Sequence, residues 1–375
     1  MHILSLQPYY GGSHKYVMDA LQAASRHTWH LLSLPPRQWQ WRMRHAALTF
    51  AEDLAARELN DEIRKSEVIF CSDMLNLAEF RGLAPGWTAD LPAVVYFHEN
   101  QFAYPARKEY QQKQNAHFGF INMRTGCAAT EVWFNSAHNR DSFFAGLERY
   151  LKKQRDEQPW ESSRRLRAKS RIIYPGIHIP STAATLRERQ PGPLRIAWAA
   201  RWEYDKGPRR FFDALGKLKA QKIPFRLRVL GEQFQRRPPV FECAAKKFHA
   251  EIDAWGYEPS RQRYLDWLKS SDVIVSSAKH EFFGISILEG AACGAVPILP
   301  NSLSYPEIFA GCNEIFYDGT AEDLARMLKK TARLVTPEIQ PEWRALRHRL
   351  HKIATSYDWR VRIQEFDKRL ASAGK

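Results

Sequence analysis

The sequence predicts an α/β protein made of two doubly wound domains in tandem. Short, continuous apolar runs alternate with helix-length stretches, and a polar, proline-containing segment interrupts this alternation once before it restarts. Apolar runs that are buried on both faces are typical of parallel strands covered by helices. Such sheets bind ligands at the carboxyl ends of their strands, so we expect the functional residues there, in a cleft between the domains.

The first domain is predicted to span residues 1–185 and to be completed by a C-terminal helix at 357–372. It opens with a strand at 2–6, a glycine turn at 9–14 and a helix at 15–24. Further strands are expected at 68–70, 93–97, 132–134 and 172–174.

The second domain is predicted to span residues 190–355. Residues 181–193 are rich in Pro, Thr, Arg and Gly and are interpreted as the linker. Beyond them, apolar runs predict strands at 194–199, 227–231, 273–276 and 295–299, and the helical pattern predicts helices at 209–220, 261–270 and 285–292.

The composition favours a polyanionic partner. Lys and Arg number 56 against 41 Asp and Glu in 375 residues, a formal net charge of +15. Such a surplus suits nucleic acid, an anionic membrane surface or a phosphorylated substrate. The five cysteines are scattered, and no signal peptide or run of 18 apolar residues occurs, so we expect a soluble cytoplasmic protein with reduced thiols.

Residues 279–290 follow a strand, open a helix and offer a diphosphate site. The first N–H groups of a helix lack internal partners, and Gly284 allows a phosphate to come close. Glu281 then faces a sugar beside the phosphates, and Glu289, eight residues on, accepts hydrogen bonds from a ribose. Alternatively, Glu281 is an acid favoured at a helix N-terminus by the helix dipole.

Two cations, Arg201 and Lys206, follow the first strand of the second domain. Fixed cations near a helix N-terminus would stabilise the charge that develops on a departing nucleoside diphosphate. Combined with Glu281 and Glu289, these motifs resemble the retaining GT-B glycosyltransferases of the Glu-x7-Glu type. This resemblance implies that Arg201 and Lys206 bind the donor diphosphate, Glu281 contacts the transferred sugar and Glu289 contacts the donor ribose.

The same resemblance implies that the glycine loop of the first domain closes over the donor phosphates. The full donor site is then Gly11, Gly12, Ser13, Arg201, Lys206, Phe283, Gly284, Ile285, Ser286 and Glu289. The catalytic set is His98, Arg201, Lys206 and Glu281. His98 follows a strand where the family places a histidine near donor and acceptor; packing or capping is the alternative.

We expect neither a metal ion nor another cofactor. The chain lacks an Asp-x-Asp motif, and Glu203 and Asp205 are more simply read as partners of the neighbouring cations. The resemblance implies retention, with the departing phosphate and the incoming hydroxyl on one face of an oxocarbenium-like sugar.

First-domain motifs narrow the resemblance to the tRNA-queuosine alpha-mannosyltransferase family. These lie at residues 9–15, 38–44, 96–101, 104–105 and 134–136, with second-domain matches at 278–284 and 305–309. The resemblance implies transfer of mannose from GDP-mannose to the cyclopentenediol of queuosine in the anticodon loop of tRNA-Asp. It also implies an acceptor site formed by Tyr10, His14, Trp39, Trp41, Arg42, Arg44, Glu99, Asn100 and Gln101.

Two further segments bear on RNA. Trp39 and Trp41 are interleaved with Arg37, Arg42 and Arg44, a pattern that stacks unpaired bases and neutralises phosphates. Core packing of the two tryptophans after a strand is the alternative. Residues 149–171 hold nine cations and three acids, and form either a solvated face or a phosphate contact made by Arg149, Lys152, Lys153, Arg164, Arg165 and Arg167.

Two other functions stay open. One is a glycosyltransferase that acts on a membrane lipid or a surface polysaccharide, which would favour exposed apolar residues on a basic helix, such as Phe143, Phe144 and Leu147. The other is a non-catalytic RNA-binding protein on a GT-B scaffold, against which the retained donor-site residues argue.

Overall fold

The computed structural model describes residues 1–56, 61–105, 109–179, 186, 188–189, 192–233, 238–335, 338 and 340–374, and of residues 109–114 the backbone alone. The chain divides into two compact units. The N-terminal unit is Met1–Gly176 with Trp359–Lys375, and the C-terminal unit is Ile177–Asp358. Much of the expected linker at 181–193 lies outside the described residues.

The N-terminal unit is built on a parallel six-stranded sheet with the order β2-β1-β3-β4-β5-β6. Its strands are β1 (His2–Gln7), β2 (Thr28–Ser33), β3 (Ser66–Ser72), β4 (Ala93–Phe97), β5 (Glu131–Phe134) and β6 (Ser170–Ile172). Its helices are α1 (Gly12–Ala24), α2 (Trp39–Ala56), α3 (Asp61–Arg64), α4 (Leu77–Leu83), α5 (Glu109–Ala128), α6 (Ala137–Leu151), α7 (Trp160–Ala168) and α15 (Trp359–Ala373).

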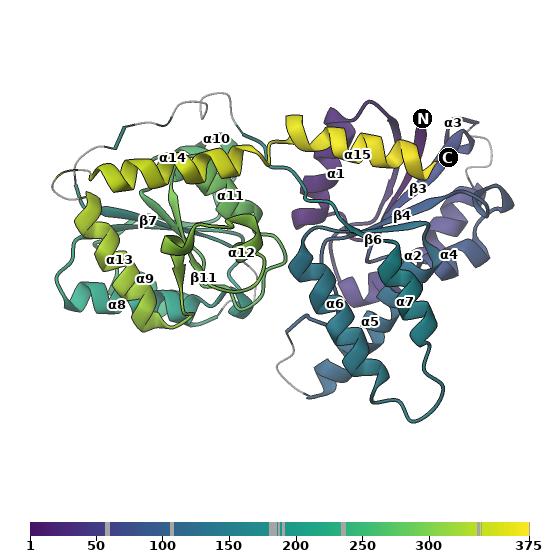
Figure 1. The fold of residues 1–375 in the computed structure, drawn as a ribbon, viewed down its shortest axis with the longest axis horizontal. Coiled ribbons are helices and arrows are strands. Elements are labelled where there is room, and N and C mark those ends of the chain that lie inside the picture. Colours follow the sequence, from purple (N-terminus) through teal and green to yellow (C-terminus); the bar gives the residue numbers. More distant parts are fainter. Residues whose placement is uncertain are drawn as a thin grey trace. The chain divides into compact units, whose positions relative to one another are not determined.

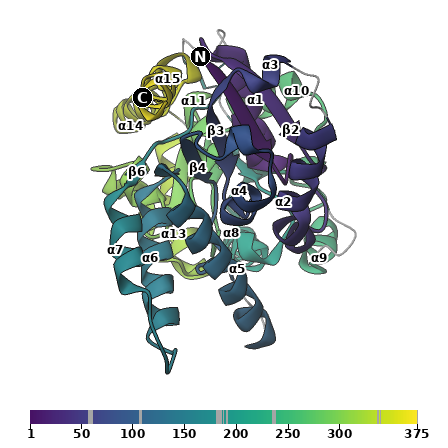
Figure 2. The ribbon, with the colours of Figure 1, turned by 90° about the vertical axis from the view of Figure 1, so that its right-hand side faces the viewer.

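Both faces of this sheet are buried, which explains the continuous apolar runs. In β4, Val94 and Tyr96 pack under α1 and α15, whereas Val95 and Phe97 pack under α2, α4, α5, α6 and α7. Figures 1 and 2 show α15 beside α1 on one side of the sheet. They also show α5, α6 and α7 next to one another. Alternate residues of one strand therefore pack into two separate hydrophobic cores, one on each face of the sheet.

The C-terminal segment of the chain contributes to the N-terminal core. Trp359, Phe366 and Leu370 of α15 are buried against the α1 face. Asp367 accepts hydrogen bonds from Ser25 Oγ at 2.6 Å and from the Arg26 amide at 3.0 Å, just after α1.

The C-terminal unit holds a second parallel six-stranded sheet, in the order β12-β11-β10-β7-β8-β9. Its strands are β7 (Leu194–Ala199), β8 (Phe225–Leu230), β9 (Ile252–Gly256), β10 (Val273–Val275), β11 (Val296–Pro300) and β12 (Phe316–Tyr317). Its helices are α8 (Pro208–Ala220), α9 (Val240–Lys247), α10 (Arg261–Lys269), α11 (Ile285–Ala292), α12 (Tyr305–Ile308), α13 (Ala321–Val335) and α14 (Pro341–Thr355).

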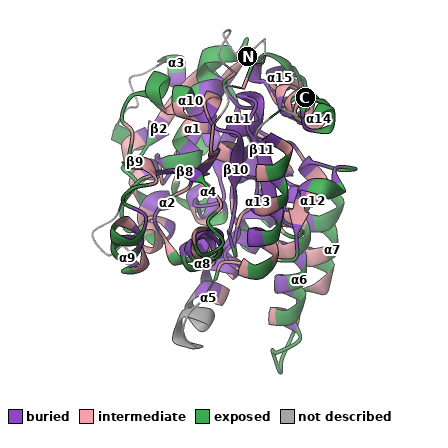
Figure 3. Cartoon of the chain, turned by 90° about the vertical axis from the view of Figure 1, so that its left-hand side faces the viewer, coloured by how far each residue is buried: buried purple, intermediate pink, exposed green. Residues whose placement is uncertain are grey.

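Helices cover this second sheet on both sides. Figure 1 shows α10, α11 and α14 on one side and α8, α9 and α13 on the other, and Figure 3 shows β8 and β10 buried between helices with exposed outer faces. Two parallel, doubly wound sheets confirm the predicted fold class. No helix within the described part of the chain is long and apolar enough to cross a membrane.

Candidate functional site

The predicted donor residues of the C-terminal unit follow the carboxyl ends of β7 and β10. These two strands are hydrogen-bonded neighbours, with Ile196 opposite Val273. The loops that follow them, at residues 200–207 and 276–284, therefore leave the same edge of the sheet. The order of the strands brings together residues about 80 positions apart in the sequence.

Lys206 is a buried cation at the centre of this edge. Its Nζ donates to the His280 carbonyl at 3.0 Å and to Glu281 Oε2 at 3.2 Å, and lies 3.5 Å from Asp205 Oδ2. Burial alone would lower the pKa of Lys206, but the charges of Glu281 and Asp205 outweigh it and raise that pKa. Burial opposes ionisation of Glu281, yet Lys206 outweighs this and lowers the Glu281 pKa. The pair is therefore ionised at neutral pH.

Arg201 differs from Lys206 in its exposure. Its side chain is 42% exposed, and its guanidinium lies 3.3 Å from Glu203 Oε2. Burial, opposed by Arg201, raises the pKa of Glu203. Arg201 is therefore placed to reach a ligand in solvent, whereas Lys206 is held between carboxylates.

The α11 N-terminus lies beside Glu281 and requires a glycine before it. Gly284 has a φ of 96°, and a Cβ there would lie 3.0 Å from the Tyr305 ring. The Ser286 hydroxyl donates to the Ala199 carbonyl at 2.7 Å, which ties α11 to β7. Phe283 is buried and packs against Tyr357, with ring centroids 5.7 Å apart. Backbone N–H groups near Ile285 are thus the groups left to hold an anion.

Glu289 lies one helical turn further along α11 and is buried. Its carboxylate forms an ion pair with Arg261 and accepts a hydrogen bond from the Tyr264 hydroxyl at 3.2 Å. Both partners come from α10. A ribose at Glu289 would have to share the carboxylate with these two side chains, which the sequence analysis did not identify.

A small pocket joins these groups. It is lined by the β7 and β10 ends and by Lys206, Glu281, Ser286 and Tyr305. The Tyr305 hydroxyl hydrogen-bonds with Ser276 Oγ at 2.7 Å, which fixes the ring against Gly284. Among the described residues, no group of three or more His, Cys, Asp or Glu side chains is arranged to hold a metal ion.

In the N-terminal unit, the glycine turn after β1 meets the loop after β4. Gly11 precedes α1, and a Cβ on it would clash with Pro36 at 2.3 Å, whereas a Cβ on Gly12 would meet nothing. Two residues after Gly12, in the first turn of α1, His14 reaches His98, and the centroids of their rings lie 4.1 Å apart. Both histidines are buried. Of the other predicted residues here, Ser13 is exposed, and the Tyr10 hydroxyl donates to Asp19 on α1.

A buried carboxyl that the sequence analysis missed supports the His98 loop. Asp73 follows β3, the strand between β1 and β4, and its Oδ1 accepts the His98 amide at 2.9 Å. Burial, with the nearby Glu99 charge, holds the Asp73 pKa well above its ordinary value. Burial and the neighbouring His14 hold the His98 pKa well below its ordinary value, so His98 is neutral at pH 7. The polar pair Ser72–Asp73 after an apolar strand was the available signal.

Asn100 and Gln101 form hydrogen bonds with other residues of the N-terminal unit. Asn100 Nδ2 donates to Asn139 Oδ1 at 2.8 Å, and the backbone N–H of Gln101 donates to Asn122 Oδ1 at 3.1 Å. Gln101 Nε2 donates to Glu99 Oε1 at 2.9 Å. Asn100 and Gln101 are buried and Glu99 is half-buried. Asn100 and Gln101 therefore shape the loop that carries His98.

The aromatic-basic segment forms the first turn of α2. Trp41 is 54% exposed, whereas Trp39 packs on Phe118 with ring centroids 5.1 Å apart. Arg44 lies over the same Phe118 ring, at 5.4 Å, and Arg42 Nε donates to the Pro35 carbonyl at 3.2 Å. Of the two tryptophans, Trp41 is thus the one available for stacking.

The basic stretch 149–171 covers the end of α6, a loop and α7. Its six predicted phosphate contacts, namely Arg149, Lys152, Lys153, Arg164, Arg165 and Arg167, are all exposed. Arg164 pairs with Glu161 at 2.7 Å, and Arg167 lies 4.2 Å from the centroid of the Phe144 ring. Phe143, Phe144 and Leu147 are buried in the core, so they form no apolar surface for a lipid.

Comparison with known proteins adds to this geometry. Residues 2–177 match the family "tRNA-queuosine alpha-mannosyltransferase N-terminal", and residues 187–335 match "Glycosyl transferases group 1". The chain is 35% identical over 320 residues to the tRNA-queuosine alpha-mannosyltransferase of Drosophila melanogaster, covering 82% of this chain and 81% of that protein.

More distant relatives share parts or the fold. A GDP-mannose-dependent alpha-(1-6)-phosphatidylinositol dimannoside mannosyltransferase of Mycobacterium tuberculosis is 26% identical over 155 residues, 41% of this chain and 40% of that protein. Anabaena HepE in complex with UDP superposes with a TM-score of 0.68 at 14% identity, covering 99% and 100% of the two chains. Sucrose-phosphate synthase of Thermosynechococcus elongatus gives 0.68 at 15% identity, covering 99% of each. These last two establish the fold alone.

Proposed function

This chain belongs to the tRNA-queuosine alpha-mannosyltransferase family, and we propose that it transfers mannose from GDP-mannose to queuosine in the anticodon loop of tRNA-Asp. Membership makes it a glycosyltransferase. The observation that carries the proposal for the chemistry is the ionised Lys206–Glu281 pair beside the α11 N-terminus.

The C-terminal unit supplies the donor half of the reaction. The GDP diphosphate lies at the α11 N-terminus, where the first helix N–H groups and Arg201 receive its growing negative charge. Lys206 holds Glu281 Oε2 and the Phe282 amide donates to Oε1 at 3.2 Å, so that the carboxylate is fixed beside the mannose ring. The mycobacterial relative is a GDP-mannose-dependent mannosyltransferase, which supports the choice of donor.

The reaction proceeds with retention and without a metal ion. The bond between mannose C1 and the phosphate oxygen breaks, and a bond from C1 to a queuosine hydroxyl oxygen forms on the same face. The hydroxyl proton passes to the departing phosphate, so no carboxylate nucleophile is required. Positive charge on the sugar is balanced by Glu281, whose lowered pKa keeps it ionised.

The N-terminal unit supplies the acceptor half. The neutral imidazole of His98 offers one donor and one acceptor nitrogen, and the adjacent His14 ring lies 4.1 Å from it, which suits the vicinal hydroxyls of a cyclopentenediol. Asp73 and the asparagines around Asn100 hold the His98 loop in place. Trp41, exposed at the start of α2, stacks on an unpaired anticodon base.

A labelled-mannose assay with two acceptors tests this proposal. The purified chain is incubated with GDP-[14C]mannose and either queuosine-containing tRNA or a total lipid extract. Label in the tRNA, absent when guanosine replaces queuosine, is the expected result. Label in the lipid fraction alone would favour the lipid-glycosylating alternative, which the partial likeness to a phosphatidylinositol dimannoside mannosyltransferase keeps testable.

A further inference from the structure

A second pocket lies at the opposite edge of the C-terminal sheet from the proposed donor site. It is formed at the beginning of β7 by Arg195 and in the turn before β10 by residues 270–272, with α14 beside it. The donor residues follow the far ends of the same two strands. A strand rises about 3.3 Å per residue, so the length of β7 separates the two places by roughly 15–20 Å. The pocket has a volume of about 180 Å³ and is partly open to solvent.

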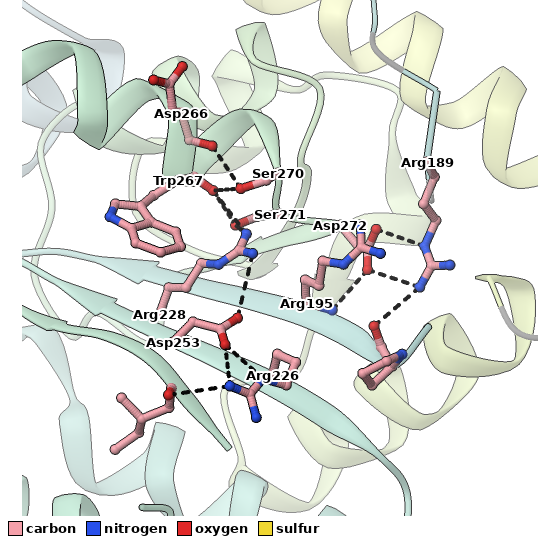
Figure 4. Close-up of polar contacts among 12 residues, drawn as sticks. Arg189, Arg195, Arg226, Arg228, Asp253, Asp266, Trp267, Ser270, Ser271 and Asp272 are labelled. Atoms are coloured by element: carbon pink, nitrogen blue, oxygen red, sulfur yellow. Dashed lines mark hydrogen bonds and ion pairs between the residues drawn. The ribbon is translucent and has the colours of Figure 1, made fainter. Parts of the chain in front are cut away.

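The described residues that line this pocket are strongly cationic. Five carry a positive charge and two a negative one, and the ten are Glu188, Arg189, Arg195, Arg228, Lys269, Ser270, Ser271, Asp272, Trp343 and Arg347. Asp272 is already engaged: it accepts from Arg189 Nε at 2.8 Å, from Arg189 Nη2 at 3.1 Å and from the Arg195 amide at 2.8 Å. Figure 4 shows this carboxylate with Arg189 and Arg195 around it.

Arg228 is the most unusual member because it is a buried cation on β8, an interior strand of the sheet. Only 5% of it is exposed, and its Nη1 donates to Ser271 Oγ at 2.8 Å and to the Trp267 carbonyl at 3.1 Å. Its nearest carboxylate, Asp253, is 3.6 Å away and is shared with Arg226. Its buried Nε donates to none of the residues that the structure describes.

Two of these cations pair with carboxylates outside the lining, Arg228 with Asp253 at 3.6 Å and Lys269 with Asp266 at 3.7 Å. Even so, five cations face four carboxylates, and one of the four, Asp253, is shared with Arg226. Burial lowers the pKa of Arg228 and of Arg347, and Arg195 acts in the same direction on Arg228. Gathering like charges in a partly buried pocket is unfavourable unless an anion offsets them. Guanidinium groups, an ammonium and two serine hydroxyls together match the oxygens of a phosphate.

We propose that this pocket binds a phosphate group, either of an RNA backbone or of a small phosphorylated compound. The inference stands on the pocket itself; only its RNA source rests on the proposed function. Phosphate held here would be remote from the reacting sugar and would take no part in the chemistry. An RNA phosphate would hold the RNA on the C-terminal unit, and a small phosphorylated compound would act as a regulatory ligand.

Binding of inorganic phosphate to three variants tests the proposal. All three carry Arg201→Ala, which weakens phosphate binding at the donor site. The first has no other change, the second adds Lys269→Gln and Arg347→Gln, and the third adds Lys217→Gln and Arg326→Gln. The third is a matched control, since Lys217 and Arg326 are cations of the same unit, ion-paired with Glu322 and Asp323 away from the pocket.

Phosphate affinity is measured by calorimetry at constant ionic strength. Losing two charge-assisted contacts should raise the phosphate Kd at least about tenfold in the pocket variant and leave the matched control within about twofold of the first protein. Equal affinities in the pocket variant and the matched control, or no saturable binding in any of the three, would overturn the proposal. If the double substitution does not fold, Lys269→Gln alone is compared with Lys217→Gln.

The source of the phosphate is separated by competition in the first protein. When saturating queuosine-containing tRNA raises the apparent Kd of inorganic phosphate, and does so less in the pocket variant, the pocket takes an RNA phosphate. When phosphate affinity is unchanged by bound tRNA, the pocket takes a small phosphorylated compound. Failure of mannose transfer with intact phosphate binding would count against the proposed function and leave the pocket standing.

Discussion

Arg201 and Lys206 look alike in the sequence but have different physical roles. Lys206 lies between Glu281 and Asp205, so its removal would leave two partly buried carboxylates without a counter-charge as well as alter the proposed donor site. Arg201 has an exposed side chain whose ion pair with Glu203 contributes little to stability. Arg201 is therefore the residue at which catalysis can be separated from folding.

Arg201→Ala should lower kcat about 10²–10³-fold because the departing diphosphate of the proposed donor loses a fixed cation. The free energy of unfolding in urea should stay within about 0.5 kcal/mol of the wild-type value. Steady-state transfer of labelled mannose gives kcat. The control is Lys217→Ala, which removes a cation of α8 that pairs with Glu322 of α13. Near-normal turnover in Arg201→Ala would place the donor diphosphate elsewhere.

Asp73 predicts a pH dependence of stability. Its folded-state pKa is raised, mainly by burial, so its contribution to stability is complete below its ordinary pKa of 3.8 and is lost as pH rises through the raised value. Asp73→Asn keeps an acceptor for the His98 amide and does not titrate. The variant should therefore gain stability relative to wild type as pH rises from about 4 to 8.

Urea unfolding at several pH values measures this difference. Asp141→Asn, an exposed carboxylate paired with Arg140 in the same unit, is the control and should show no such trend. A wild-type-like pH profile in Asp73→Asn would mean that Asp73 ionises normally in the folded protein.

Sequence reasoning located the residues at strand ends but not their partners. Arg201, Lys206 and Glu281 were predictable because each follows an apolar strand run and carries a charge. Tyr305 and Tyr264 were not, since their proximity to Gly284 and Glu289 depends on how α10, α11 and α12 pack. The shared structural role of Asn100 and Asn139 was equally invisible, because the contact spans 39 residues of sequence.

At the scale of elements, the start of α2 separates two tryptophans that the sequence presents as a pair. Trp41 is 54% exposed, while Trp39 packs on Phe118. Stacking on an unpaired base contributes about 1–3 kcal/mol. Trp41→Ala should therefore reduce the preference for queuosine over guanosine tRNA, in kcat/KM, by about fivefold or more.

The control for Trp41 lies on the same helix. Leu48 is 45% exposed, and Leu48→Ala should leave the preference unchanged. Both variants should keep nearly the wild-type stability because neither side chain is in the core. An undiminished preference in Trp41→Ala would remove this part of α2 from the acceptor site.

Helix α7 carries the second prediction at this scale. Arg164 and Arg165 are exposed and share Glu161, so their substitution by Gln should not disturb the core. If they contact tRNA phosphates, the double variant should raise KM for tRNA and lower the salt slope of log K by about 0.7–0.9 per lost contact, with kcat unchanged. Filter binding over a range of salt concentrations measures the slope.

A double variant on α13, Arg326→Gln with Lys329→Gln, removes the same charge from the other unit. It controls for general loss of positive potential. Equal salt slopes for the α7 and α13 variants would mean that α7 does not contact tRNA and is a solvated surface.

For the whole molecule, the sequence was most informative about buried parallel strands. β4, β7 and α11 have the predicted bounds, because their apolar runs are continuous and end abruptly. β2 and β9 were not anticipated: they form sheet edges, and their mixed exposure breaks up the apolar run. The units divide at Gly176/Ile177 and again at Asp358/Trp359, whereas the sequence analysis had set the boundaries at 185/190 and 355/357. The packing of side chains, and not the local composition, determines where the chain passes from one unit to the other.

The central claim is that the site around Lys206 and Glu281 places mannose from GDP-mannose on queuosine without a metal ion. Mass spectrometry of nucleosides from queuosine-containing tRNA-Asp, after incubation with the chain, GDP-mannose and excess EDTA, tests it most directly. The predicted result is queuosine carrying one hexose, sensitive to an alpha-mannosidase, and absent with Arg201→Ala under single-turnover timing. Unmodified queuosine in EDTA that becomes mannosylated only when Mn²⁺ or Mg²⁺ is restored would contradict the account.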